Sequence, residues 1–248
     1  MRDWLTAFFM AWGMFCAVPC PCRRWDERQY PKMLLCLPLI GLLLGGLWAL
    51  AAWGLRRLGA PGLFSAALLT ALPCLLTGCI HLDGFLDCAD AVLSRRGLEE
   101  RRKILKDPHV GSFSVICLAL LLLLAFSLLA SADLRGRLLC AAFLPASVRA
   151  ASAAAVLSFA PLESSGYAGM RERTPRAYRA AAWAGSALFA LAPAALFGVP
   201  GLAAAAASLG AWGTILRCRK NLGGMSGDVS GAAVAVGELC GLAALTLL

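Results

Sequence analysis

Long runs of apolar residues, separated by short polar stretches, make up most of this chain. Seven runs are long enough to cross a bilayer, because a helix of about 20 apolar residues spans roughly 30 Å of hydrocarbon. The polar stretches are too short to form a separate soluble domain. The pattern therefore predicts an all-α, polytopic integral membrane protein with a single membrane-embedded domain over residues 1–248. The predicted spans are residues 33–55, 62–80, 113–131, 138–160, 180–198, 200–216 and 229–248.

The first apolar stretch, residues 1–19, does not fit this pattern. It is interrupted at Pro19 and Pro21, and proline breaks the interior of a helix. It lacks a small-residue cleavage site, so we do not expect a cleaved signal peptide. We expect a re-entrant or interfacial segment, with an eighth span as the alternative.

The composition supports the assignment to a membrane. Hydrophobic residues make up 60% of the chain, only 15% are charged, and the mean hydropathy is +0.75. Soluble domains carry about 25% charged residues. The net charge of +9 would suggest nucleic acid in a soluble protein, but here we expect lipid and no nucleic acid as a partner. The 11 cysteines contain no CxxC pair, and we expect them to be reduced thiols.

The basic residues alternate between the loops. Most of the 23 lysines and arginines fall in residues 20–32, 81–112, 161–179 and 217–228. Basic loops collect on the cytoplasmic side of a membrane. We therefore predict a multi-pass protein of the cell inner membrane, with its large polar loops facing the cytoplasm.

Three aspartates follow the second predicted span. Asp83, Asp87 and Asp90 are spaced i, i+4, i+7, which places them on one face of a helix. Carboxylates so close repel one another unless a cation lies among them. Their hard oxygen donors suit Mg²⁺. The alternative is a solvated helix end with aspartates near the N-terminus, which accounts for Asp83 alone.

The polar stretch after these aspartates contains further candidates. Lys106, Asp107 and Gly111 lie in a turn just before the next span, which should return to the interface where the aspartates lie. Lys106 and Asp107 are therefore candidate catalytic residues. His81 and His109, at the two ends of the stretch, are candidates for binding substrate or moving a proton. The alternative for each histidine is a polar anchor at the interface.

A glycine-rich stretch leads into the last span. Gly224 and Gly227 permit close backbone approach, and the amides at a helix N-terminus can hold an anion. Asp228 adds a fourth carboxylate on the same side. The alternative is a plain turn with Asp228 as the N-cap. A carboxylate-bound cation beside groups that tolerate phosphate suits phosphoryl transfer.

Three motifs resemble one known family in order and approximate spacing. They are "HLDGFLDCAD" from residue 81, "ILKDPHVGSF" from residue 104 and "LGGMSGDVSG" from residue 222. They resemble the signatures of the cobalamin synthase family, the adenosylcobinamide-GDP ribazoletransferases. The resemblance implies a Mg²⁺-dependent inner-membrane enzyme. It would join α-ribazole, or its 5′-phosphate, to adenosylcobinamide-GDP with release of GMP, giving adenosylcobalamin or its 5′-phosphate.

The resemblance also implies roles for individual residues. Asp83, Asp87 and Asp90 match the family's acidic motif and would hold Mg²⁺ on the diphosphate. Lys106 would steady the phosphates. The matching positions of the other two motifs are Lys106, Asp107 and Gly111, and Gly227 with Asp228. The chain departs from the family pattern at Ala91, where glycine is usual, and at Cys16 and Ala17, where Thr-Arg is frequent.

Two other classes remain as alternatives. A CDP-alcohol phosphotransferase also uses interfacial aspartates and a divalent metal, but its motif has Ala-Arg after Asp-Gly, which is absent here. An ion-coupled transporter would place its carboxylates nearer the bilayer midplane. The form of ribazole used and any homo-oligomeric state stay open.

Overall fold

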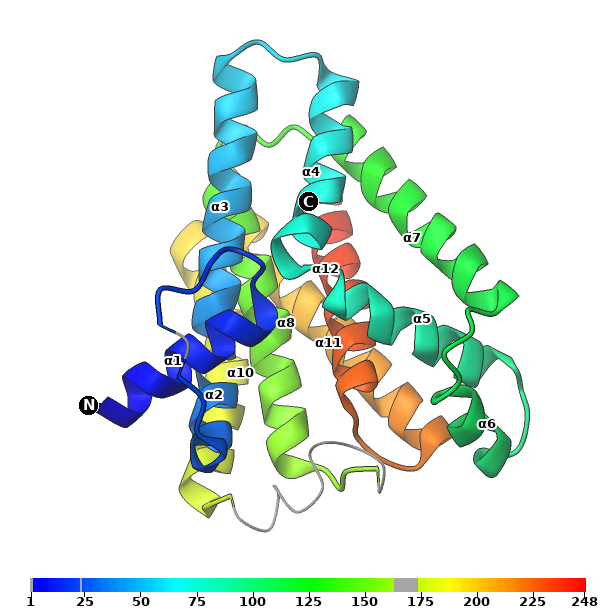
Figure 1. Cartoon of the computed structure of the whole chain (residues 1–248). Coiled ribbons are helices and arrows are strands. Elements are labelled where there is room, and N and C mark those ends of the chain that lie inside the picture. Colours follow the sequence, from blue (N-terminus) through cyan, green and yellow to red (C-terminus); the bar gives the residue numbers. More distant parts are fainter. Residues whose placement is uncertain (1, 23, 163–173) are drawn as a thin grey trace.

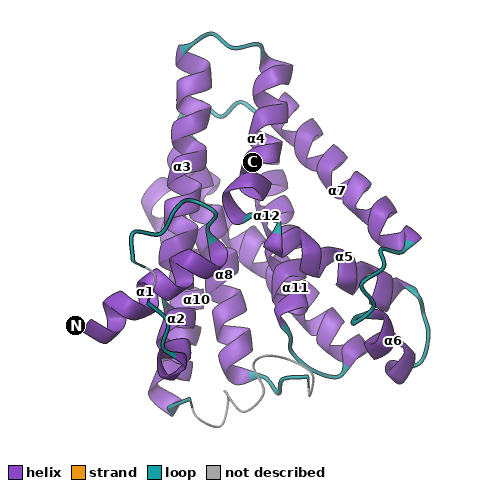
Figure 2. Cartoon of the chain, in the orientation of Figure 1, coloured by secondary structure: helices purple, strands orange, loops and turns teal. Residues whose placement is uncertain are grey.

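The computed structural model describes residues 2–22, 24–162 and 174–248. These residues form helices and connecting loops without a β-strand, which confirms the all-α prediction (Figures 1 and 2). All 11 cysteines are free, as expected. The helices are α1 (Arg2–Phe15), α2 (Tyr30–Leu35), α3 (Leu37–Arg57), α4 (Gly62–Thr77), α5 (Ile80–Leu93), α6 (Leu98–Ile104), α7 (Ser112–Ser131), α8 (Leu138–Ser158), α10 (Arg176–Phe197), α11 (Leu202–Leu222) and α12 (Gly227–Leu247), with 3-10 turns η1 (Glu27–Gln29) and η2 (Val199–Gly201).

The described part of the chain contains six helices that can cross a bilayer, and one bent helix pair that would be a seventh span if it counts as one. The helices α3, α7, α8, α10, α11 and α12 are each long and apolar enough to cross a bilayer. The remaining predicted span, residues 62–80, corresponds to α4, which forms a bent pair with α5. The protein is therefore a multi-pass membrane protein, as predicted.

The predicted span over residues 62–80 ends in a bend between α4 and α5, which was not predicted. The two helix axes meet at 94°. Gly78 (φ 60°) and Cys79 (φ 63°) both adopt the left-handed conformation, which ends one helix and redirects the chain. The amide of Cys79 donates to the Cys74 carbonyl at 2.9 Å and closes the turn. As a result, α5 runs across the bundle instead of leaving it (Figure 1).

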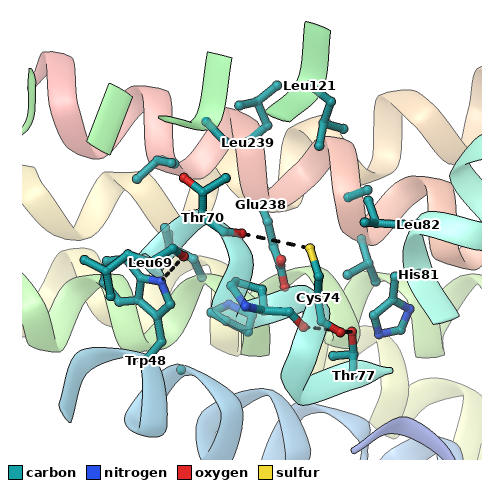
Figure 3. Close-up of a pocket in the computed structure, with 18 of the residues that line it drawn as sticks. Trp48, Leu69, Thr70, Cys74, Thr77, His81, Leu82, Leu121, Glu238 and Leu239 are labelled. Atoms are coloured by element: carbon teal, nitrogen blue, oxygen red, sulfur yellow. Dashed lines mark hydrogen bonds between the residues drawn. The ribbon is translucent and has the colours of Figure 1, made fainter. Parts of the chain in front are cut away.

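A contact with α3 supports α4 just before this bend. Pro73 lies inside α4 and has no N–H, so it cannot donate to the carbonyl of Leu69 as the helix requires. The indole Nε1 of Trp48 donates to that carbonyl instead, at 2.9 Å (Figure 3). The missing helical bond is thereby replaced by a bond between helices.

Small residues allow the spans to approach closely. A Cβ at Gly45 of α3 would lie 2.1 Å from the carbonyl oxygen of Ala142 in α8, and one at Gly41 would lie 2.5 Å from the Cα of Ala146. Only glycine fits at these two positions. The helix α8 is the most buried of the six helices that can cross a bilayer, because 78% of the residues in its apolar stretch are buried inside the structure.

The N-terminal segment reaches into the bundle. At 14 residues, α1 is only about 21 Å long, which is too short for the eighth span. The Phe15 ring stacks on His81 with centroids 6.1 Å apart, and the amide of Ala17 donates to the Leu76 carbonyl at 2.7 Å. The segment therefore ends against the bend between α4 and α5, as a re-entrant or interfacial segment can.

Candidate functional site

The three aspartates of the acidic motif lie on α5, as their spacing predicted. Asp83 is exposed, whereas Asp87 and Asp90 are half-buried. The face of α5 that packs into the bundle is made of small side chains, including Gly84 and Cys88. One side of the helix is therefore free to pack closely while the carboxylates remain accessible.

The packing of α5 on α12 brings a fourth carboxylate to this helix. A Cβ at Gly84 would lie only 2.7 Å from the Cα of Asp228, and one at Gly231 of α12 would lie 3.0 Å from the carbonyl oxygen of His81. The two backbones are thus nearly in contact. Asp83, Asp90 and Asp228 all lie close enough for their charges to act on Asp87. We call Asp83, Asp87, Asp90 and Asp228 the carboxylate cluster.

The start of α12 orients Asp228 toward this cluster. Ser226, not Asp228, is the N-cap, because its Oγ accepts a hydrogen bond from the Val229 amide at 3.3 Å. The alternative in which Asp228 capped the helix is therefore wrong. The Ser226 hydroxyl donates a hydrogen bond to Oδ2 of Asp228 at 3.2 Å. The carboxylate of Asp228 is therefore held by the side chain of Ser226 and does not serve as the helix cap.

Gly224 and Gly227, two of the three glycines that we expect to bind substrate, differ in their surroundings, and the third is Gly111. A Cβ at Gly227 would meet no atom within 4 Å, so open space adjoins the start of α12 there. A Cβ at Gly224 would lie 2.8 Å from the Leu162 amide nitrogen. Gly224 thus allows residues 160–162 to pass close to the turn between α11 and α12. Substrate binding by either glycine stays a prediction.

Asp90 joins α5 to the start of α7. Its Oδ2 accepts from the Gly111 amide at 2.7 Å and its Oδ1 accepts from the Ser114 amide at 3.0 Å. A Cβ at Gly111 would lie 2.5 Å from Oδ1 of Asp90, so glycine is required for this approach. Asp90 therefore acts as an N-terminal cap supplied by another helix. The turn before α7 returns to the aspartates, as expected.

This arrangement predicts that Asp90→Ala loosens the start of α7. Two backbone amides lose their acceptor, at a cost of about 1 kcal/mol or more. Hydrogen exchange at Gly111 and Ser114 should rise at least about fivefold, while Mg²⁺ titration of the purified protein should change little. Asp90→Asn keeps one strong acceptor and should give a smaller increase. Unchanged exchange together with lost Mg²⁺ binding would show that Asp90 is a metal ligand instead.

The candidates Lys106, Asp107 and His109 lie on the surface of the same turn. Oδ1 of Asp107 accepts from the His109 amide at 3.0 Å and contacts Nδ1 of His109 at 2.6 Å. The hydrogen bond from the His109 amide lowers the pKa of Asp107 from its usual value, and the hydrogen bond from the His109 side chain lowers it further. Lys106 is exposed and makes no ion pair within the described ranges. Its catalytic role stays a prediction.

The basic residues of α6 have structural partners. Arg101 Nη1 donates to Oδ1 of Asn221 at 2.7 Å, and Arg102 Nε donates to the Leu222 carbonyl at 3.1 Å. Lys103 pairs with Glu100 at 2.8 Å. The two arginine contacts fasten α6 to the end of α11, where carbonyls lack helical partners, so these three basic side chains have structural partners.

The carboxylate cluster suits a divalent cation by its chemistry. Within the described residues, no lysine, arginine or histidine forms an ion pair with its four members. No three His, Cys, Asp or Glu side chains of that part of the chain are grouped closely enough to surround one ion. Mg²⁺ usually binds one or two carboxylates and completes its shell with water and phosphate oxygens. The donors therefore fit Mg²⁺ without a third protein ligand.

A cavity of about 140 Å³ adjoins α5 on another side (Figure 3). Aliphatic residues of α3, α4, α7, α8 and α12 form most of its wall, and no member of the carboxylate cluster lines it. His81 lines it, and its buried Nε2 has no hydrogen-bond partner in the described part. Arg149, which is 3% exposed, pairs there with Glu238 at 2.8 Å. The buried charges of Arg149 and Glu238, each within a span, therefore compensate one another.

Comparison with known proteins gives one consistent result. The profile of the cobalamin-5-phosphate synthase family matches residues 7–246. An adenosylcobinamide-GDP ribazoletransferase of Clostridium perfringens is 35% identical over 253 residues, covering 100% of both chains. The protein of the same name from Pseudomonas entomophila is 41% identical over 227 residues, covering 89% of this chain and 90% of that one. No solved structure matches this chain.

Proposed function

The chain belongs to the cobalamin-5-phosphate synthase family, and from that premise we propose its detailed reaction. It is a transferase of cobalamin synthesis. A ribose hydroxyl of α-ribazole, or of its 5′-phosphate, attacks the phosphorus attached to cobinamide in adenosylcobinamide-GDP. The new P–O bond forms as the bond to GMP breaks, and the hydroxyl proton passes to a base. The products are adenosylcobalamin, or its 5′-phosphate, and GMP.

The observation that carries this proposal is the contact between α5 and α12. It places Asp228 beside the aspartates of α5, in a cluster without a lysine or arginine partner among the described residues. Uncompensated carboxylates at one site are costly, and they are usually functional in a membrane protein. Such a cluster supports a reaction in which a cation and a diphosphate meet.

We propose that two of the three carboxylates of Asp83, Asp87 and Asp228 supply the protein's oxygen donors for Mg²⁺. When bound, Mg²⁺ would offset negative charge on the diphosphate and on the GMP leaving group. Asp90 was expected among the ligands, but both of its oxygens already accept backbone amides. We assign it a positioning role, in which it holds the turn that carries Lys106 beside the cluster.

The remaining residues act on the substrates directly. The ammonium group of Lys106 is exposed and free to approach a phosphate as a point charge. One carboxylate of the cluster accepts the proton of the attacking hydroxyl, and the accessibility of Asp83 favours it for this step. The open space beside Gly227 leaves room for a phosphate near the amides that begin α12.

We also propose that the protein lies in the cell inner membrane with this site toward the cytoplasm. Three basic segments lie at the same end of the bundle: the loop before α3, the loop that contains α6, and the turn between α11 and α12 (Figure 1). Basic loops face the cytoplasm. The family assignment favours this reaction over a CDP-alcohol phosphotransferase or an ion-coupled transporter.

Turnover by the purified protein tests the proposal. The protein in phospholipid nanodiscs, given adenosylcobinamide-GDP, α-ribazole and Mg²⁺, should form one GMP for each cobalamin product, as measured by liquid chromatography. Addition of EDTA should stop the reaction and excess Mg²⁺ should restore it. Absence of product with both α-ribazole and its 5′-phosphate would contradict the reaction. Full turnover in EDTA would contradict only the role of the metal.

A further inference from the structure

The outward face of α11 carries a stripe of exposed leucines. Leu202, Leu209 and Leu216 are 45%, 72% and 53% exposed and are spaced by seven residues, so they lie along one side of the helix. Because α11 is long and apolar enough to span the bilayer, this side faces hydrocarbon. The stripe therefore offers an apolar surface to a lipid chain.

An aromatic layer lies among the last two leucines, toward the end of α11. Trp212 lies on the same face, between Leu209 and Leu216, and its ring stacks on Trp183 of α10 with centroids 4.7 Å apart. Phe159, just after α8, meets Trp212 edge-on at 6.1 Å. Tryptophan is enriched where hydrocarbon gives way to headgroups. The aromatic layer therefore indicates the depth at which a headgroup begins.

A basic pocket lies one turn beyond Leu216. The Arg219 guanidinium sits 3.5 Å from the centroid of the Phe159 ring, and Lys220 is exposed beside it. Neither side chain forms an ion pair in the described part of the chain, and Nε of Arg219 is buried there without a hydrogen-bond partner. Arg219, Lys220, Gly223 and Gly224 line a pocket of about 240 Å³.

We propose that this face of α11 binds an anionic membrane phospholipid, with its phosphate in the basic pocket. Along this side of α11 the first side chains are aliphatic, the next are aromatic and aliphatic together, and the last are basic, which matches the acyl chain, the interface and the phosphate of a lipid. Basic pockets at the ends of spanning helices bind acidic headgroups in this way. A soluble nucleotide or phosphate would use the basic pocket alone and leave the leucine stripe without a role.

The site is separate from the carboxylate cluster. No residue that lines the basic pocket belongs to the cluster. Lipid binding at α11 therefore does not depend on the reaction proposed above, and the two can fail independently.

Thermal unfolding in nanodiscs tests this proposal. Phosphatidylglycerol added to phosphatidylcholine discs should raise the apparent Tm of the wild-type protein by roughly 5 °C. The double variant Arg219→Gln, Lys220→Gln should lose this shift. The control Arg57→Gln should keep it, because Arg57 also lies over an aromatic ring, Trp53, at 5.4 Å, but at the opposite end of the bundle.

Three outcomes would overturn the proposal. One is a full phosphatidylglycerol shift in the double variant. Another is a shift of equal size that inorganic phosphate produces in phosphatidylcholine discs and that the double variant loses, which would assign the pocket to a soluble anion. The third is equal loss in Arg57→Gln, which would indicate a general charge effect. Lys220→Gln alone, which removes no hydrogen bond or ion pair of the described residues, serves as the test if Arg219→Gln does not fold.

Discussion

Asp83→Asn is expected to abolish measurable turnover, a loss of at least about 10³-fold. Asparagine has nearly the same shape but carries no charge, so it binds Mg²⁺ weakly and cannot accept a proton from the attacking hydroxyl. Because Asp83 is exposed and its side chain makes no hydrogen bond or ion pair in the described part of the chain, the fold should be unaffected. Release of GMP by the purified variant in nanodiscs is the measurement.

Asp133→Asn is the matched control for this experiment. Asp133 is also an exposed carboxylate, but it lies between α7 and α8 and pairs with Arg135 at 3.6 Å. Its replacement should leave turnover within about twofold of the wild-type value, since exposed ion pairs contribute little. Near-normal activity of Asp83→Asn would remove Asp83 from the metal site and from the role of base.

Gly84→Ala is expected to reduce turnover by about 10²-fold or more, although no charged group changes. The added Cβ would lie 2.7 Å from the Cα and 2.8 Å from the carbonyl oxygen of Asp228. Backbone atoms cannot rotate away, so α12 must move relative to α5. A displacement of about 1 Å at a catalytic group can lower the rate by about 10². The kcat for GMP release and the apparent Tm in nanodiscs are the measurements.

Gly46→Ala is the control for the added methyl group. Gly46 also lies inside a helix, but a Cβ there would meet no atom within 4 Å. Alanine should be tolerated and should stabilise α3 slightly, because its helix propensity is higher. Equal activity in Gly84→Ala and Gly46→Ala would mean that the close approach of α5 and α12 does not position the carboxylates.

The helical spans could be predicted from the sequence because apolar length alone determines them. The same property explains why the bend was missed. The mean hydropathy of residues 62–80 is high whether the chain is straight or bent, because hydropathy contains no information about the direction of the helix axis. Gly78 was a signal for the left-handed turn, but Cys79 is not a residue type that favours positive φ. The bend depends on packing that the local sequence does not specify.

The candidate site was predicted in part for a related reason. The local spacing of Asp83, Asp87 and Asp90 predicted that they lie on one helix. The position of the Gly111 turn, just before the next span, predicted that this turn returns toward them. The partners of these residues are distant in sequence. The cap that Asp90 supplies to α7 is a contact between helices, and spacing within one helix cannot predict it.

The ion pair of Arg149 and Glu238 was missed for the same reason, since 89 positions separate its members. A signal was nevertheless available. Each is a charged residue inside an otherwise apolar span, and two such charges of opposite sign often find each other in a membrane bundle. If the charged residues within the predicted spans had been paired with one another, the contact between α8 and α12 could have been predicted from the sequence.

The contact of Gly84 with α12 also constrains the biogenesis of the protein. Helix α5 emerges early in synthesis and carries three aspartates, each of which is unfavourable in hydrocarbon by about 3 kcal/mol. The surface that receives it and the fourth carboxylate belong to α12, the last helix of the structure. A nascent chain that ends at α11 therefore has spans but no complete acidic centre. If the carboxylate cluster acts as proposed, turnover requires that the final segment has entered the membrane and docked on α5.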